Sequence, residues 1–98
     1  MKTQKEMIEA LKQRFEGSII LDGIEFSNEY KQGYCIWFKN ASDVTYTKKD
    51  LNPISAIDNG IYENKKYNME VYHKFEKWCL KRGWYPSTEN YTLNLFKL

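Results

Sequence analysis

Residues 64–83 constrain the fold of this chain more than any other stretch, because at helical pitch they separate into two opposite faces. One face is apolar and carries Val71, Tyr72, Phe75, Trp78 and Cys79. The opposite face is basic and carries Lys66, His73, Lys74, Lys77 and Lys81. A helix of this kind buries its aromatic face against other elements. We therefore expect a helix over residues 64–82, ended by Gly83 and packed onto a core.

A second amphipathic helix is expected near the start of the sequence. Thr3 and Glu6 form a T-x-x-E capping box, in which each side chain satisfies a backbone N–H at the helix start. The apolar stripe that follows at spacings of three and four consists of Met7, Ile8, Leu11 and Phe15. Gly17 supplies the left-handed residue that commonly follows a helix.

Three strands are expected between the two helices. Residues 18–26 have strand composition with a bulge or bend at Gly23. Residues 34–38 are apolar on both faces, which favours a central position in a sheet. Residues 44–47 give a short third strand, and we expect it to form a hairpin with the second.

The remaining segments complete the predicted fold. Residues 48–63 carry breakers that favour turns, residues 84–87 are expected to form a loop, and residues 91–98 alternate as a last strand. Ninety-eight residues are enough for one domain only. The predicted class is therefore α+β: a single small domain over residues 1–98 in the order α-β-β-β-α-β, with an antiparallel sheet of three to four strands packed by two helices.

Few residues of this chain are suited to catalysis. His73 is its only histidine, which argues against a zinc site and against a nucleophile paired with a base. Cys35 and Cys79 follow no CxxC spacing and are expected to be free, packed thiols. No glycine-rich phosphate loop occurs. We expect no enzyme activity, no catalytic residues, no metal and no cofactor.

Charge and hydropathy restrict the location and the partners of the chain. No apolar run approaches the ~20 residues of a membrane span, and the first residues lack a secretion signal. We expect a soluble, cytoplasmic protein that does not contact a membrane. Its 15 basic and 13 acidic residues leave a net charge of only +2, so a nucleic-acid partner is not indicated by the overall charge.

The aromatic content points to a contact surface. Eight tyrosines and three tryptophans exceed what a core of this size needs, and both residue types are enriched in protein interfaces. Trp84 and Tyr85 follow the second helix in a predicted loop, where they are hard to bury. The predicted partner-binding residues are Lys66, Lys74, Lys77, Lys81, Arg82, Trp84 and Tyr85. A lysine-rich helix face that is merely solvated is the alternative.

Two functions fit these patterns. The first is a small non-enzymatic domain that binds another protein. A preference for Lys, Asn, Ile and Tyr is typical of AT-rich genes, so a phage or mobile-element inhibitor of a host defence or nucleic-acid-processing complex fits this hypothesis. The alternative is a weak nucleic-acid-binding protein that uses the basic face of the second helix. Its candidate contacts are Lys65, Lys66, Lys74, Lys77, Lys81 and Arg82.

Overall fold

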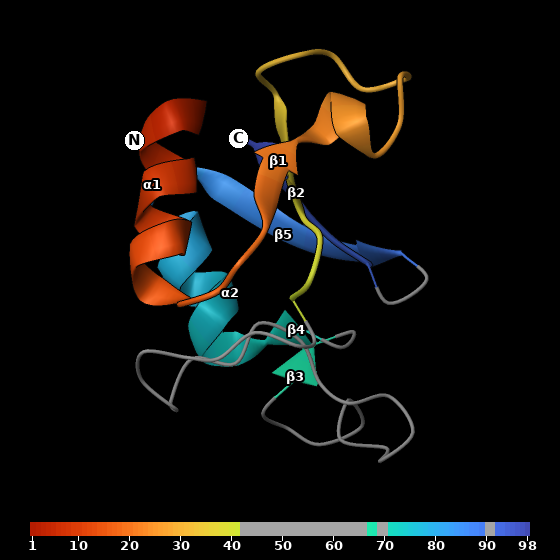
Figure 1. Cartoon of the computed structure of the whole chain (residues 1–98). Coiled ribbons are helices and arrows are strands. Elements are labelled where there is room, and N and C mark those ends of the chain that lie inside the picture. The colour runs from red at the N-terminus through yellow and green to blue at the C-terminus, as the bar shows by residue number, and fades with distance from the viewer. Residues whose placement is uncertain (42–66, 69–70, 90–91) are drawn as a thin grey trace.

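The protein folds as a four-stranded antiparallel sheet with two helices on one face (Figure 1). The computed structural model describes residues 1–41, 67–68, 71–89 and 92–98. Its helices are α1 (Gln4–Arg14) and α2 (His73–Leu80), and a short 3₁₀ helix, η1, spans Gly23–Glu25. The strands of the main sheet, in their spatial order, are β1 (Ile20–Asp22), β2 (Cys35–Phe38), β6 (Thr92–Lys97) and β5 (Trp84–Glu89). A small separate hairpin consists of β3 (Tyr67–Asn68) and β4 (Val71–Tyr72).

The class and arrangement predicted from the sequence are confirmed: a small α+β domain, order α-β-β-β-α-β, with two helices and an antiparallel sheet. β2 is central, as its apolar faces indicated, and β6 matches the predicted last strand. Residues 84–87 are not a loop, because β5 covers them and pairs with β6 as a hairpin. The strand expected at residues 44–47 and the segment 48–63 lie outside the described residues.

The N-terminal helix forms as its sequence dictates. Thr3 Oγ1 accepts a hydrogen bond from the Glu6 N–H at 3.2 Å, and Glu6 Oε1 accepts one from the Thr3 N–H at 2.9 Å. This reciprocal box satisfies two backbone donors that would otherwise lack a partner at the start of the helix. Met7 and Leu11 then point into the core and are fully buried.

The register of the sheet separates its residues into two faces. Ile36 pairs with Leu95 and Phe38 pairs with Leu93, and all four are buried beneath the helices. Because side chains alternate along a strand, the intervening positions of β2 and β6 point away from the helices. On that second face Trp37 is the cross-strand neighbour of Asn94.

Aromatic rings fill the core between the helices and the sheet. Phe15 makes edge contacts with Phe38 at 5.5 Å and with Phe75 at 5.6 Å between ring centroids. Trp84 of β5 is also fully buried, and its Nε1 donates to the Lys2 carbonyl at 3.0 Å. The core thus joins α1, α2 and the sheet through large side chains, each of which buries much apolar area.

Asp22 fixes the segment that follows β1. One carboxylate oxygen accepts from the Ile24 N–H at 3.0 Å, while the other accepts from Gln4 Nε2 at 2.9 Å and the Gly33 N–H at 3.1 Å. Gln4 Nε2 also donates to the Cys35 carbonyl. One side chain therefore ties the start of α1 to η1 and to Gly33, which lies shortly before β2. This explains why the predicted strand over residues 18–26 ends at Asp22.

The second helix is shorter than the sequence pattern predicted. It begins at His73 rather than near residue 64, because Val71–Tyr72 forms β4 and pairs with Tyr67–Asn68 of β3. It ends at Leu80, two residues before the predicted end, and the glycine after the helix is as predicted: the Gly83 N–H donates to the Leu80 carbonyl, and Gly83 has a positive φ of 85°. This conformation suits glycine and reverses the chain into β5.

Candidate functional site

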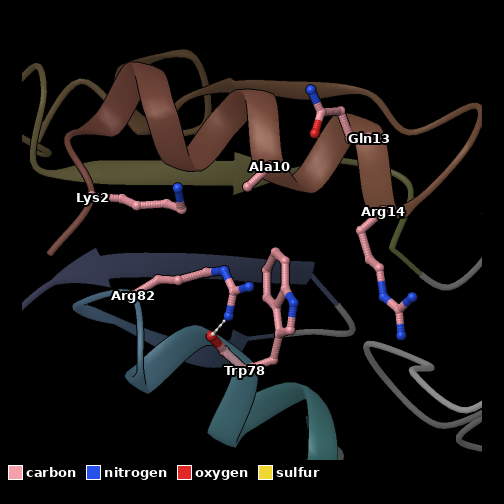
Figure 2. Close-up of a pocket in the computed structure, with 6 residues that line it drawn as sticks. All are labelled: Lys2, Ala10, Gln13, Arg14, Trp78 and Arg82. Atoms are coloured by element: carbon pink, nitrogen blue, oxygen red, sulfur yellow. Dashed lines mark hydrogen bonds between the residues drawn. The ribbon is translucent and has the colours of Figure 1, made fainter.

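A cavity of about 310 Å³ opens between α1 and α2. Its lining residues are Lys2, Ala10, Gln13, Arg14, Trp78 and Arg82. Figure 2 shows that Lys2 and Arg82 extend into the space between the helices, with the Trp78 ring standing between Arg82 and Arg14. We call this site the interhelical cavity. It joins an aromatic ring to several cationic groups.

The Arg82 side chain is held in place on Trp78. Its Cζ lies 4.0 Å from the centroid of the Trp78 ring, and its Nη1 donates to the Trp78 carbonyl at 2.9 Å. Phe75 stacks on the same indole at 6.1 Å with an interplanar angle of 16°, and Phe15 meets it edge-on at 6.3 Å. The guanidinium is therefore positioned by the core before any ligand arrives, which reduces the entropic cost of binding.

The interhelical cavity is electrostatically one-sided. Lys2, Arg14 and Arg82 line it, and no carboxylate does so among the residues that the structure describes. The buried Nε of Arg82 has no hydrogen-bond partner within the described ranges. Cations gathered beside an apolar wall favour an anionic group, because the low dielectric of the wall strengthens the attraction.

A second cavity of about 200 Å³ adjoins the first along α1. It is lined by Lys2, Glu6, Glu9, Ala10 and Gln13, so three residues border both spaces. The hydrogen bonds with Thr3 hold the pKa of Glu6 below its usual value, which keeps this carboxylate ionised. The pair of cavities therefore places two carboxylates beside the cationic group.

The predicted lysines of α2 and of the turn that follows it form an exposed stripe next to Trp78, although none of them lines the interhelical cavity. Lys74, Lys77 and Lys81 are all exposed. Lys74 lies four residues before Trp78 and Lys81 three residues after it, and these spacings make neighbours on a helix surface. We call these three residues the lysine stripe. Its charge extends the cationic character of the cavity onto the open surface.

The structure separates the predicted partner-binding residues. The expectation that Trp84 is exposed is wrong, because β5 directs its side chain into the core, where it is fully buried. Tyr85 is 45% exposed, but it follows Trp84 in the same strand and points to the opposite face of the sheet. Arg82 and the lysine stripe stay together on the helix side, and Lys66 lies outside the described residues.

Lys2 and Trp78 belong to the cavity but were missed as site residues. The spacing of four between Trp78 and Arg82 was a usable signal, because it stacks a cation on an indole along a helix. The position of Lys2 was not visible in the sequence, since it depends on contacts across the whole chain. Its N–H donates to the Arg82 carbonyl, and its carbonyl accepts from Trp84.

Both cysteines are free and buried, as predicted. Burial, and then the negative charge of Asp22, raises the pKa of the Cys35 thiol to about 11. Burial raises the pKa of Cys79 well above its usual value. Both thiols are therefore protonated near neutral pH, which makes them poor nucleophiles. Among the described residues, no group of three or more His, Cys, Asp or Glu is placed to hold a metal ion.

In the part of the chain that the structure describes, no helix has the length and apolar character needed to cross a membrane. Comparisons of the chain with protein-family models, with curated proteins and with solved structures find no match. The functional proposal therefore depends on the geometry and charge of the surface itself.

Proposed function

We propose that this chain is a non-enzymatic cytoplasmic domain that binds another protein through the interhelical cavity and the lysine stripe. The observation that carries the proposal is the Arg82 guanidinium fixed on Trp78, with Lys2 alongside it. Arginine and tryptophan are the residue types most enriched in interface hot spots. The lysine stripe adds a charged rim, which raises the rate of encounter with an acidic surface.

The surroundings of Trp78 favour a protein over a single-stranded nucleic acid at this cavity. Non-specific nucleic-acid binders gain affinity by stacking bases on exposed aromatic faces. Arg82 already lies over the Trp78 ring and Phe75 packs beside it, so the indole is less open to a stacked base than a fully exposed ring. The carboxylates of Glu6 and Glu9 beside the cavity would also repel a continuous phosphate backbone.

The lysine stripe on its own supports the alternative of weak nucleic-acid binding. Contact between three lysines and phosphates would give a slope of roughly −3 in a plot of log affinity against log salt concentration. The corresponding dissociation constant would be on the order of 10⁻⁴ to 10⁻⁶ M at physiological salt. Titration of duplex and single-stranded DNA and RNA at several salt concentrations tests this alternative directly.

The protein-binding proposal is tested by affinity capture from an extract of the host cell, followed by mass spectrometry. The test variant reverses the charge of the stripe with Lys74→Glu, Lys77→Glu and Lys81→Glu. The matched control reverses three other exposed lysines with Lys5→Glu, Lys12→Glu and Lys31→Glu. Circular dichroism checks that both triple variants keep the wild-type fold.

We expect one dominant protein to be captured by the wild type and the control, to resist nuclease treatment, and to be lost with the stripe variant. Capture of nucleic acid alone would favour the alternative function. If all three forms capture the protein equally, the lysine stripe is not part of the interface and the proposal is overturned. The inhibitor hypothesis stays a prediction, and a dominant protein from a defence or nucleic-acid-processing complex would support it.

A further inference from the structure

We infer that the two adjoining cavities together bind a mixed-charge peptide segment of the partner, with an acidic side chain in the interhelical cavity and a basic side chain beside Glu9. This inference deepens the proposed function and rests on it. Lys2, Ala10 and Gln13 border both cavities, so one short segment is able to enter both. Three cations line the interhelical cavity, whereas two carboxylates and Lys2 line the second cavity, and this difference in charge defines the partner's chemistry.

The acidic side chain is assigned to Arg82. The guanidinium is the cation best suited to a carboxylate, because its planar N–H groups match the two oxygens. Its Nη1 already donates to the Trp78 carbonyl and its Cζ lies over the indole ring, so the position of the guanidinium is restricted before a ligand binds. Lys2 extends into the same space and supplies a second cation (Figure 2).

The basic side chain is assigned to the second cavity. Glu6 and Glu9 line it, and Glu6 is partly engaged by Thr3 at the helix cap. Glu9 is exposed and is therefore the main group available to a cation from outside. A uniformly acidic ligand would place one of its charges against these carboxylates, whereas an acid beside a base matches both cavities.

Nuclear magnetic resonance of the full ¹⁵N-labelled chain tests the inference with three defined probes. The first is a blocked peptide in which glutamate and lysine alternate with glycine spacers. The second replaces every lysine of that peptide with glutamate, and the third is an oligothymidylate of similar length. The indole N–H of Trp78 reports on the cavity, and that of Trp37, on the opposite face of the sheet, is the internal control.

We expect the mixed-charge peptide to shift the Trp78 indole signal and to leave the Trp37 signal unchanged. Arg82→Gln should weaken this peptide at least about tenfold, because a charge-assisted hydrogen bond is lost. Lys31→Gln is the matched control, since Lys31 is exposed, lies outside α1 and α2, and lines neither cavity. If Arg82→Gln alters the Trp37 signal of the free protein, Arg82→Lys replaces it in the comparison and should still weaken binding severalfold.

Glu9→Gln tests the second cavity, because it removes the negative charge of an exposed side chain and should affect the two peptides in opposite directions. It should weaken the mixed-charge peptide and strengthen the all-glutamate peptide, while Glu16→Gln changes neither. The inference is overturned if the Trp78 signal does not move at about 1 mM mixed-charge peptide. It is also overturned if the Arg82 substitutions do not weaken binding of the mixed-charge peptide. The same holds if the all-glutamate peptide or the oligothymidylate binds more tightly than the mixed-charge peptide.

The two proposals fail in different ways. If the stripe variant loses the captured host protein but peptide binding ignores Arg82 and Glu9, the proposed function stands and the inference about the cavities is wrong. If the peptide responds as expected but no host protein depends on the lysine stripe, the proposed function is wrong.

Discussion

Replacement of Phe15 by alanine should destabilise the protein more than a substitution at its surface. Phe15 is fully buried and meets Phe38, Phe75 and Trp78 edge-on at 5.5, 5.6 and 6.3 Å between ring centroids. Truncation of a buried phenylalanine to alanine costs about 3–5 kcal/mol. The whole unfolding free energy of a domain is about 5–15 kcal/mol, so Phe15→Ala removes a large share of it. Phe15→Leu keeps an apolar side chain and should cost only about 1–2 kcal/mol.

Urea unfolding followed by circular dichroism measures these losses. A small domain loses about 1–3 kcal/mol of stability per molar urea, so a loss of about 4 kcal/mol lowers the midpoint by roughly 2 M. Leu80→Ala is the control, because Leu80 is 38% exposed on α2 and its truncation should cost only about 1–2 kcal/mol, less than that of a fully buried side chain. A loss below about 1.5 kcal/mol for Phe15→Ala, with an unchanged denaturant slope, would refute the reasoning that Phe15 joins α1, α2 and the sheet.

Three further predictions concern the cap, the carboxylate beside η1 and the thiols. Thr3→Ala should lower the unfolding free energy by about 1 kcal/mol through loss of the helix cap, whereas Thr3→Ser should not. Burial alone would raise the pKa of Asp22, but its hydrogen bonds outweigh burial and hold the pKa below 3.8. Its stabilising contribution is therefore complete above pH 3.8 and is lost as the pH falls through the folded-state pKa. Asp22→Asn should cost about 1–3 kcal/mol at pH 7, and the pH dependence of urea unfolding should converge with the wild type in acid; parallel curves would contradict this. Cys35 and Cys79 should resist alkylation at pH 8 in native protein and react once it is unfolded, as mass spectrometry would show.

Elements governed by local signals were predictable from the sequence. The capping box placed the start of α1 at Thr3, and the predicted left-handed glycine after the second helix is Gly83, whose φ is positive. β2 was identified as central because both of its faces are apolar. For the cap and the glycine the deciding interactions lie within a few residues in the sequence, and for β2 the signal is the composition of the strand itself, so a single local pattern contains the information.

Elements governed by distant pairing were not predictable in the same way. The apolar positions at Val71 and Tyr72 fit a helix equally well, but pairing with Tyr67–Asn68 makes them a strand. Pro86 made residues 84–87 resemble a loop, yet β5 is an edge strand of the sheet, where proline is tolerated. The wrong expectation that Trp84 is exposed follows from this error. A strand alternates its side chains between core and surface, and Trp84 takes a core position.

Only the part of the candidate site that lies in and after α2 could be predicted from the sequence, for the same reason. The lysine stripe and Arg82 lie close together in the sequence, in α2 and the turn that follows it, and their spacing is readable from the sequence. The contribution of α1, with Lys2 and Glu9, depends on how two helices that are distant in sequence pack together. The sequence accordingly indicated a basic face but not the cavity beside it.

The two ends of the described chain both lie beside the turn at Arg82 and Gly83. The Lys2 N–H donates to the Arg82 carbonyl, and the Leu98 N–H donates to the Gly83 carbonyl, which brings residues 1 and 98 to the same side of the molecule (Figure 1). Anything fused to either end would emerge next to Arg82 and crowd the approach to it. Tethering through the exposed turn at Glu29 would instead leave that approach open, and a circularly permuted chain with joined ends should retain the fold.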